Sequence, residues 1–451
     1  MKNITFIISV LVLCALMFFF ESSNIDWAQS KAAAPAFLTQ KNIYKIKCDK
    51  PAPKPYIAPN ELNMPYFSDG VMSLYVTNPV LFLDAKENLR TAIAKNLVQE
   101  INNAKHTIDF AVYGVEGQPS VVKALIDAQK RCVRVRWVTD SDAKGNNIYA
   151  DTKKTMGFLK ECMCDSNILS TQKNALMHNK FFIIDGETLI TGSANLSNTD
   201  LSGFNSNVYI KIKSPQICDI YQREFDQMYQ GLFHNVKNQI TDKTNIKLAN
   251  NNVVSVYFSP KDKTISNAIV PLIDGAQKYV YMPVFFLTDK NTAQALIKAR
   301  QRGVDVRVIL DATAAANGYS VHKDLRAQGG KVKVENWAGK MHQKSLIIDD
   351  ETVVIGSMNF SKSGENKNDE NCIVINNAPE LAQKYRDYFL MLYGSIPNKW
   401  LTQDPRAESS DSVGSCSDGV DNDFDGKIDT QDSGCFTFYS NKPRPKKKIY
   451  R

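Results

Sequence analysis

Two octapeptides carry the residue types most suited to chemistry, and they share the pattern His-x-Lys-x4-Asp. They are HNKFFIID at 178–185 and HQKSLIID at 342–349, and each is followed at the same distance by Gly-Ser-x-Asn. On an extended strand, side chains two residues apart point to the same face, so each octapeptide presents an imidazole beside an ammonium group. The doubled pattern predicts these candidate site residues: His178, Lys180, Asp185, Ser193 and Asn195 in the first copy, and His342, Lys344, Asp349, Ser357 and Asn359 in the second.

Two histidines with two lysines suit displacement at phosphorus without a metal ion. One neutral imidazole attacks, the other donates a proton to the leaving oxygen, and the lysines neutralise the phosphate oxygens. The Gly-Ser turns would let the backbone and a hydroxyl approach a phosphate, and the Asn adds a donor. The chain has only five histidines, so two of them recurring in one pattern is no accident of packing. The other three, His106, His234 and His322, are predicted to be structural.

The two motifs lie inside an internal repeat. Residues 123–140 match 294–311, and residues 177–215 match 341–379 without a gap. Two copies of one domain is the economical explanation of this self-similarity. We therefore expect repeat 1 at 66–240 and repeat 2 at 241–398.

Helical periodicity alternates with β-rich runs in each copy. In the first copy we expect helices at 89–104 and 120–131 and strands at 107–113 and 133–139. The second copy repeats this order from 264 to 310. Such alternation predicts an α/β fold with helices packed on a sheet.

Two further features fit this fold class. The apolar runs at 181–184 and 345–348 are suited to central strands. The segments 200–229 and 364–393 each end in a helix rich in aromatic residues, and the spacing predicts core packing rather than a ligand cage.

The doubled motif resembles the phospholipase D superfamily, whose signature is His-x-Lys-x4-Asp with a downstream Gly-Ser and Asn. The resemblance covers about residues 70–395. It implies two tandem α/β/α sandwich domains packed about a pseudo-twofold axis, with the active site at their interface. It also implies a two-step reaction through a phosphohistidine, with no cofactor for catalysis.

The resemblance gives each site residue a role. His178 is implied to attack phosphorus, and His342 to protonate the leaving alcohol and then to activate water. Asp185 and Asp349 are counted with the catalytic residues, although they more readily organise the site than react. The remaining residues are expected to hold the phosphate: Lys180, Lys344, Asn195, Asn359, Ser193 and Ser357.

Glu370 is one further catalytic candidate. It follows Asn368, where the family often places a carboxylate that orients a catalytic histidine, and the gap-free repeat match puts Ser206 at that position of the first copy. We expect Glu370 to orient one imidazole, and the sequence leaves open which. The choice of nucleophile depends on this point.

Composition narrows the function classes. The 451 residues are 43% hydrophobic and 23% charged, which is ordinary globular composition and excludes a multi-pass membrane protein. The net charge is +8, but six positive residues lie within 442–451, so the body is near neutral. Charge alone therefore does not argue for a nucleic-acid-binding body.

The N-terminus predicts export. Lys2 precedes an apolar run at 4–20, and residues 28–30 offer a small-x-small cleavage site, so we expect a signal peptide at 1–30 and a linker at 31–65. An uncleaved anchor is the alternative. The protein would be periplasmic or secreted. Eight cysteines remain after cleavage, which permits disulfides, and their spacing fits no zinc site.

Near the C-terminus, residues 405–440 contain an EF-hand-like loop between Cys416 and Cys435, and a basic tail follows at 441–451. The loop resembles the DNDxDG modules of exported bacterial proteins, closed here by a disulfide. We expect a structural Ca²⁺ outside the catalytic repeats. The predicted ligand positions are Asp421, Asp423, Asp425, Lys427, Asp429 and Asp432.

The motif indicates the reaction class better than the substrate. The first interpretation is a phospholipase D that acts at a phospholipid membrane surface as a monomer. A metal-independent endonuclease that binds nucleic acid, a phosphatidyltransferase such as a cardiolipin synthase, and an inactive binding module are the alternatives. The loops at 141–176 and 312–340 would select the substrate, together with Tyr319 and Trp337, and Trp337 could equally cover the core.

Overall fold

The computed structural model describes residues 65–81, 84–86, 89–141, 149, 151–159, 175–437 and 440–443. The predicted signal peptide, nearly all of the linker, most of the loop at 141–176 and residues 444–451 of the basic tail lie outside the described residues. In the described part, no helix combines the length and the apolar character needed to cross a bilayer.

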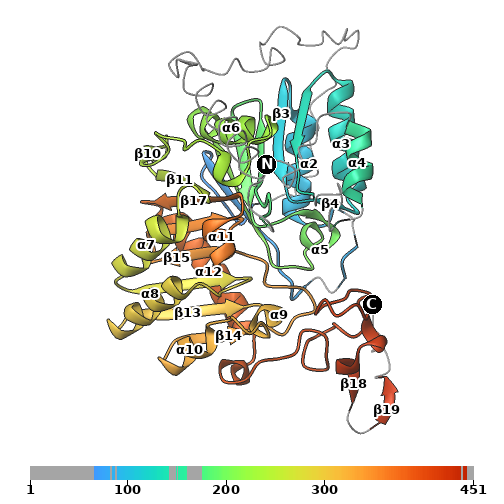
Figure 1. Ribbon diagram of the computed structural model, residues 1–451, viewed down its shortest axis with the longest axis vertical. Helices are drawn as coiled ribbons and strands as arrows, with labels where there is room; N and C mark the ends of the chain where they lie inside the picture. Colours follow the sequence, from blue (N-terminus) through green and yellow to red (C-terminus); the bar gives the residue numbers. More distant parts are fainter. Residues whose placement is uncertain are drawn as a thin grey trace, which may run out of the picture. The chain divides into compact units, whose positions relative to one another are not determined.

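The first half of the described chain forms a mixed sheet with helices (Figure 1). Its elements are β1 (Phe67–Ser68), β2 (Met72–Val76), α2 (Ala92–Asn103), β3 (Thr107–Val112), β4 (Val115–Glu116), α3 (Pro119–Lys130), β5 (Arg134–Val138), α4 (Asp151–Leu159), β6 (Lys180–Ile184), β7 (Thr188–Gly192), β8 (Leu196–Ser197), α5 (Asn198–Leu201), β9 (Val208–Lys213), α6 (Pro215–Tyr229) and the short η3 (His234–Val236).

The second half repeats this order and then continues into a loop region. Its elements are β10 (Ile246–Lys247), β11 (Val253–Ser259), η4 (Ile265–Ile269), α7 (Val270–Gly275), β12 (Tyr279–Val284), α8 (Lys290–Gln301), β13 (Asp305–Leu310), α9 (Ala312–Ala315), α10 (His322–Ala327), β14 (Lys331–Val334), β15 (Ser345–Ile348), β16 (Thr352–Gly356), α11 (Lys362–Asn366), β17 (Glu370–Asn376), α12 (Pro379–Ser395), η5 (Asn398–Leu401), η6 (Asp429–Gln431), η7 (Ser433–Cys435), β18 (Phe436–Thr437) and β19 (Ser440–Pro443).

The two large sheets share the order of seven strands, and the second has β14 in addition at one edge. Among the described residues the first runs β1-β2-β9-β7-β6-β3-β5, and the second runs β10-β11-β17-β16-β15-β12-β13-β14. The motif strand, β6 or β15, lies near the middle and pairs antiparallel with both neighbours. The strands β3 with β5, and β12 with β13 and β14, are parallel and are joined through helices. The repeat and the α/β fold expected from the sequence are confirmed.

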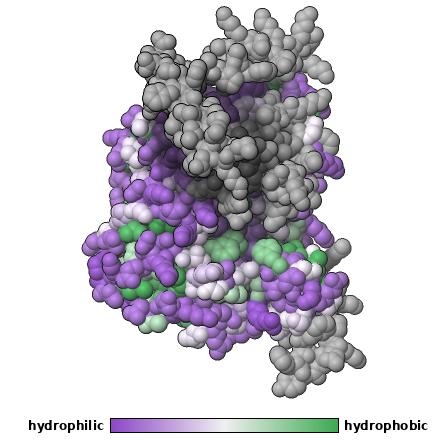
Figure 2. Space-filling view, in the orientation of Figure 1, coloured by the Kyte–Doolittle hydropathy of each residue, from purple (hydrophilic) through white to green (hydrophobic). Residues whose placement is uncertain are grey.

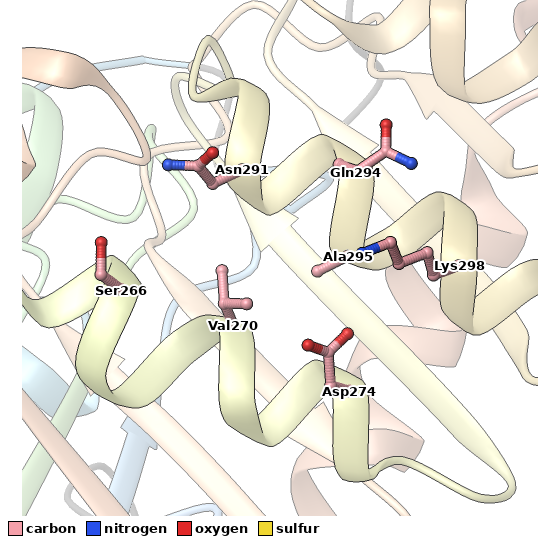
Figure 3. Close-up of a pocket in the computed structure, with 7 residues that line it drawn as sticks. All are labelled: Ser266, Val270, Asp274, Asn291, Gln294, Ala295 and Lys298. Carbon is pink, nitrogen blue, oxygen red and sulfur yellow. The ribbon is translucent and has the colours of Figure 1, made fainter.

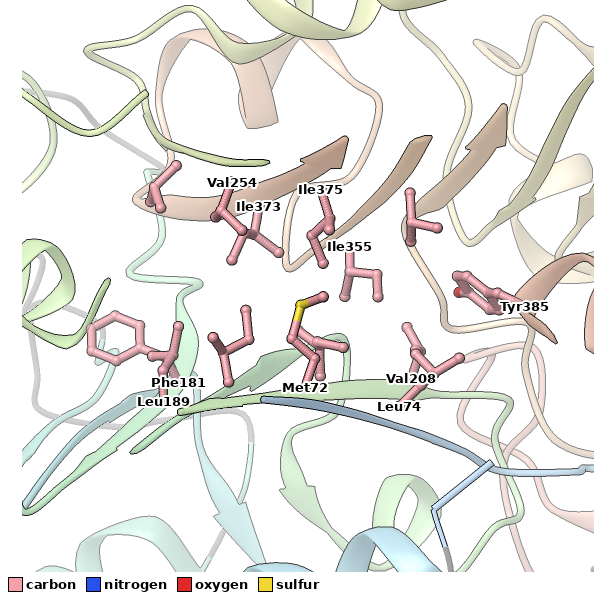
Figure 4. Close-up of a cluster of buried hydrophobic side chains, with 14 of the residues drawn as sticks. Met72, Leu74, Phe181, Leu189, Val208, Val254, Ile355, Ile373, Ile375 and Tyr385 are labelled. Atoms are coloured by element: carbon pink, nitrogen blue, oxygen red, sulfur yellow. The ribbon is translucent and has the colours of Figure 1, made fainter. Parts of the chain in front are cut away.

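A shared hydrophobic core joins the two repeats. Met72, Leu74 and Val208 on one sheet face Ile355 and Ile373 on the other across an apolar interface (Figure 4). The aromatic helices α6 and α12 pack into the same core, in agreement with their spacing. The opposite face of the first sheet is covered by α2 and α3, and that of the second by α7 and α8.

The motif strands are apolar because both of their faces are buried. Phe181 and Ile183 of β6 enter the shared core, while Phe182 and Ile184 pack toward α2 and α3. This alternation is the period of two expected of a strand covered on both sides. The face drawn in Figure 2 is mostly hydrophilic where it is coloured, with a few hydrophobic patches.

The gap-free match between the repeats conceals a shift of one residue. Gly192 pairs with Tyr209 in the first sheet, whereas Gly356 pairs with Cys372 in the second. The sequence offset between equivalent residues of β9 and β17 is therefore one residue smaller than the offset between the two motifs. The first copy has one extra residue before β9, and the second has Asn377, with φ of 54°, after β17. The two differences cancel, which makes the alignment look continuous. The expected match of Ser206 with Glu370 is therefore wrong, and the structural partner of Glu370 is Asn207.

The motif glycines serve strand packing. A Cβ on Gly356 would lie 2.3 Å from the carbonyl oxygen of Asn371, and one on Gly192 would lie 2.0 Å from that of Val208. The sequence favours a role for these turns in admitting a phosphate. The structure instead gives each glycine the role of letting the neighbouring strand come close.

Gly356→Ala should destabilise the protein by about 1–3 kcal/mol, because the added methyl forces β16 away from β17. Gly394→Ala is a matched control, since Gly394 lies in α12 and an added methyl there would meet no atom within 4 Å, and it should stabilise by about 0.5–1 kcal/mol. Urea unfolding measures both. Equal effects from the two variants would contradict this account of Gly356.

Candidate active site

The two motifs place their histidines and lysines at equivalent points of the two sheets. Lys180 is the first residue of β6, and Lys344 directly precedes β15. Both lysines are buried, whereas His178 and His342 keep exposed fractions of 8% and 9%. Each histidine therefore keeps slightly more exposed surface than the lysine two residues after it.

Each motif is attached to the other repeat through its backbone. The His178 N–H donates to the Asp369 carbonyl at 2.8 Å, and the His342 N–H donates to the Ser206 carbonyl at 3.0 Å. The reverse bonds are equally matched, because Asp369 N–H donates to Leu176 and Ser206 N–H donates to Lys340. The structure thus brings the two motifs together at the interface between the repeats.

His178 is oriented by Glu370. Its Nδ1 lies 2.8 Å and 3.0 Å from the two carboxylate oxygens, and Ser357 Oγ donates to the same carboxylate at 2.6 Å. A carboxylate acceptor places the imidazole proton on Nδ1 and leaves Nε2 with its lone pair. The question left open by the sequence is answered: Glu370 of repeat 2 orients the histidine of repeat 1.

His342 is oriented differently. Its Nδ1 lies 3.1 Å from the amide oxygen of Asn207 and 3.3 Å from a carboxylate oxygen of Asp200. Asn207 in turn donates to Asp200 at 2.9 Å and accepts from Ser193 Oγ at 2.8 Å. One imidazole thus bonds directly to a carboxylate, and the other bonds to an amide that a carboxylate supports.

Burial and positive neighbours change the charge states. Burial lowers the pKa of His178, partly offset by Glu370, and lowers that of His342 still further, with both lysines adding to the decrease. Burial also lowers the pKa of Lys180 to about 8, and burial together with Lys180 lowers that of Lys344 well below its usual value. An anion at the site would relieve this repulsion among positive charges.

Aromatic rings complete the symmetric arrangement. Tyr113 packs edge-on against His178 at 5.4 Å between centroids, and Phe285 packs in the same way against His342 at 5.1 Å. Lys180 lies over Tyr113 at 5.8 Å, and Lys344 lies over Phe285 at 5.0 Å. Each lysine also donates to the carbonyl of the histidine two residues before it. These contacts limit the rotamers of the four motif side chains.

The two motif asparagines leave a buried amide oxygen without a partner. Asn195 donates to Asp200 at 3.0 Å and to the Tyr149 hydroxyl at 3.2 Å, while its Oδ1, like Oδ1 of Asn359, accepts no hydrogen bond among the described residues. The motif serines donate instead to Asn207 and Glu370. Phosphate contact by these four residues stays a prediction.

The motif aspartates lie at the other end of the strand. Asp185 accepts backbone N–H groups at 105–107, and Asp349 accepts those at 277–279, all at 2.7–3.2 Å. Seven residues of extended chain place Asp185 roughly 20 Å from His178. Both aspartates therefore hold the backbone of a neighbouring turn, and they lie far from the motif histidines.

Four residues that contact the motifs or their supporting groups were not identified from the sequence. Asp200 lies in α5, and Asn207 lies just before β9, where the one-residue shift hid its correspondence with Glu370. Asp140 and Asp311 occupy matching places in the repeat and accept the N–H of Met177 and of Met341, at 2.8 Å and 3.2 Å. Asp140 and Asp311 are the last residues of the matched segments 123–140 and 294–311, so the match between the repeats could have identified them.

The expected substrate loops are only partly described. Trp337 is 6% exposed and belongs to the shared core, so it covers the core, whereas Tyr319 is 83% exposed. Among the described residues, the surface hollow lined by Ser266, Val270, Asp274 and residues of α8 lies between helices and includes no motif residue (Figure 3). The candidate site formed by the motif residues therefore lies apart from this hollow.

The C-terminal loop has the donor set expected for a hard cation. Carboxylate oxygens of Asp423, Asp425 and Asp432 lie within 4.8 Å of one another, and the Cys416–Cys435 disulfide closes the loop. Burial and the neighbouring carboxylates raise the pKa of Asp423. Asp421 accepts from the Gly426 N–H at 2.9 Å. Oxygen ligands of this kind fit Ca²⁺.

Two of the predicted ligand positions carry side chains with other partners. The Asp429 carboxylate accepts the N–H groups of Asp418 and Gly419, and the Lys427 ammonium pairs with Asp425 at 3.1 Å. In an EF-hand loop position 7 binds through its carbonyl oxygen, which leaves the side chain of Lys427 free for this pair.

The comparisons with known proteins agree with this geometry. The family model described as "Cardiolipin synthase, PLD-like domain" matches residues 97–229 and 269–393. A protein of Rickettsia bellii named phospholipase D is 34% identical over 146 residues, which is 32% of this chain and 72% of that protein. A cardiolipin synthase of Clostridium perfringens strain 13 is 24% identical over 330 residues, 66% of each chain.

A solved structure gives the same fold over a longer span. The crystal structure of phosphatidylserine synthase from Haemophilus influenzae Rd KW20 has a TM-score of 0.53 at 14% identity, and covers 70% of this chain and 87% of that one. At this identity the similarity concerns the fold alone. It extends over both repeats, as the shared core requires.

The charge of Lys180 predicts the alkaline limit of activity. Lys180 is charged below its pKa of about 8 and loses its charge as the pH rises through that value, so kcat/KM for an anionic phosphodiester should fall above about pH 8. Lys180→Arg is the control, because a guanidinium stays charged and should move the decline to higher pH. A pH profile measures both, and an unmoved decline in the arginine variant would contradict the assignment.

Proposed function

Because the chain belongs to the phospholipase D superfamily, we propose that it is an exported phosphodiesterase that hydrolyses phospholipids to phosphatidic acid and a free head group. The observation that carries the proposal is the pair of imidazoles at the repeat interface, each held through Nδ1 by the opposite repeat. The apolar segment at 4–20 supports export. The near-neutral body with its basic tail favours a lipid surface over nucleic acid.

His178 is the proposed nucleophile. Glu370 holds the proton on Nδ1 and directs the free Nε2 toward phosphorus, and its negative charge stabilises the positive imidazole that forms on attack. Burial keeps the pKa of His178 low, so the imidazole is neutral near pH 7. The product of this first step is a phosphohistidine, and the P–O bond to the head group breaks.

His342 is the proposed acid and then base. Its pKa is lowered by burial and by Lys180, Lys344 and His178. A bound phosphodiester anion would neutralise the lysines and raise this pKa, so that substrate binding itself loads the proton. His342 then donates to the leaving alcohol oxygen. In the second step it removes a proton from water, which attacks the phosphohistidine.

Phosphatidyl transfer is the second candidate. It differs only in that an alcohol replaces water in the second step. The cardiolipin synthase similarity over 330 residues favours it. A nuclease activity would use the same chemistry and is kept as an outcome of the test.

The mature protein in EDTA should release head group from mixed phospholipid vesicles, and His178→Ala should reduce this release by roughly 10⁴-fold or more, because it removes the nucleophile. His106→Ala is a matched control, since the His106 side chain is exposed and its contact with Asp185 is made by the backbone N–H. Single- and double-stranded DNA are offered in the same reaction. Cleavage of DNA with intact lipid would overturn the lipid assignment, and transfer to added glycerol would favour the second candidate.

We also propose that the C-terminal loop binds one structural Ca²⁺. Asp421, Asp423, Asp425 and Asp432 would hold it, and its charge would relieve the repulsion among these carboxylates. Calorimetry on the full chain should detect one site, and Ca²⁺ should raise the melting temperature. Asp425→Asn should weaken binding by about tenfold or more, whereas Asp219→Asn, an exposed aspartate on α6, should not. The absence of any binding heat and of any thermal shift would refute the site.

A further inference from the structure

The C-terminal loop is packed on the segment of chain that leads into the second motif. This segment, residues 336–341, connects β14 to His342 and Lys344. Val413 N–H donates to the Asn336 carbonyl at 2.8 Å, and the Asn336 side chain donates back to the Asp411 carbonyl at 3.2 Å. The first contact between the C-terminal region and this segment is therefore a single parallel β-bridge, between Val413 and Trp337.

Asn422 makes the central contact. Its side-chain amide donates to the Ala338 carbonyl at 2.8 Å, and its own carbonyl accepts from Lys340 Nζ at 2.6 Å and from Thr313 Oγ1 at 3.0 Å. Asn422 is 2% exposed, and its N–H donates to Glu408 at 2.7 Å. One residue of the loop thus bonds to three points on repeat 2.

The opposite side of the segment is held by repeat 1. Lys340 N–H donates to Asn205 Oδ1 at 2.8 Å, and Lys340 carbonyl accepts from Ser206 N–H at 2.7 Å. A Cβ on Gly339 would lie 1.7 Å from the Phe204 carbonyl oxygen, so the two chains touch through their backbones. The segment is clamped between repeat 1 and the C-terminal loop, two residues before His342.

Lys340 also interacts electrostatically with two buried carboxylates near the second motif, Asp311 and Glu335. Asp311, which accepts the Met341 N–H, and Glu335 are both buried, and burial raises the pKa of each, while the charge of Lys340 opposes the increase. Lys340 also lies over the ring of Phe424 at 4.0 Å. The ammonium group is therefore fixed by the loop at a place where its charge compensates two carboxylates.

We propose that the C-terminal loop is a clasp that positions the second motif, with Asn422 and Lys340 as its positioning residues. The proposal rests on the proposed function, because it predicts which step fails when the clasp loosens. His342 carries the acid and base role, whereas His178 is held by Glu370 on β17. A loosened clasp should therefore impair protonation of the leaving group and spare the attack on phosphorus.

The test compares Lys340→Met and Asn422→Ala with the control Lys399→Met in the full chain. Lys399 is an exposed lysine stacked on Trp400 at 4.1 Å, and none of its described contacts reaches the clasp. The first readout is hydrogen exchange of the amides at 340–342, each of which donates a hydrogen bond. Exchange should accelerate by about tenfold or more in the two clasp variants and stay unchanged in the control.

The second readout compares two phosphodiesters, one with an aliphatic leaving alcohol and one with 4-nitrophenol, which leaves without protonation. The clasp variants should lose about tenfold or more in the first step on the aliphatic substrate and less than about threefold on the nitrophenyl one. Unchanged exchange would overturn the proposal, and so would equal losses on both substrates. If the wild-type chain cleaves neither, the proposed function fails, while exchange still decides whether the clasp holds the segment.

Discussion

The hydrogen bond from His178 Nδ1 to Glu370 joins residues that are 192 positions apart. The rest of the site depends on such hydrogen bonds, in which one repeat orients the histidine of the other. Neither repeat alone contains an oriented imidazole, because Glu370 serves His178 while Asn207 and Asp200 serve His342. The proposed chemistry at phosphorus therefore requires that both repeats fold and pack on their shared core. The apolar interface between the sheets holds the two repeats together, and the hydrogen bonds that orient the two histidines depend on it.

The site also buries four basic side chains close together, and their mutual repulsion and loss of hydration disfavour the charged forms. Two lysines and two histidines are enclosed together, which lowers all four pKa values. Isolated buried charges are costly, so the free protein keeps part of the cluster neutral. In the proposed reaction an anionic substrate would supply the missing charge, so that binding of the substrate and loading of the catalytic proton would be one event.

The sequence was sufficient for the repeat, the α/β fold and the pairing of motifs, because their signals are local and periodic. It was not sufficient for the group that orients each histidine. Asp200 and Asn207 act across the repeat interface, and one inserted residue before β9, cancelled by Asn377, hid the correspondence of Asn207 with Glu370. The contact between Asn422 and Lys340 was also invisible, since it joins residues 82 apart with no shared pattern.

The most direct test of the central claim is to identify the phosphorylated residue. His342→Ala, given a radiolabelled nitrophenyl phosphodiester, should form the intermediate and be slow to hydrolyse it, because the leaving group needs no acid while water needs a base. Digestion at alkaline pH with mass spectrometry should then place the label on His178. Label on His342 in the wild-type protein, with His178→Ala still able to form it, would contradict the account.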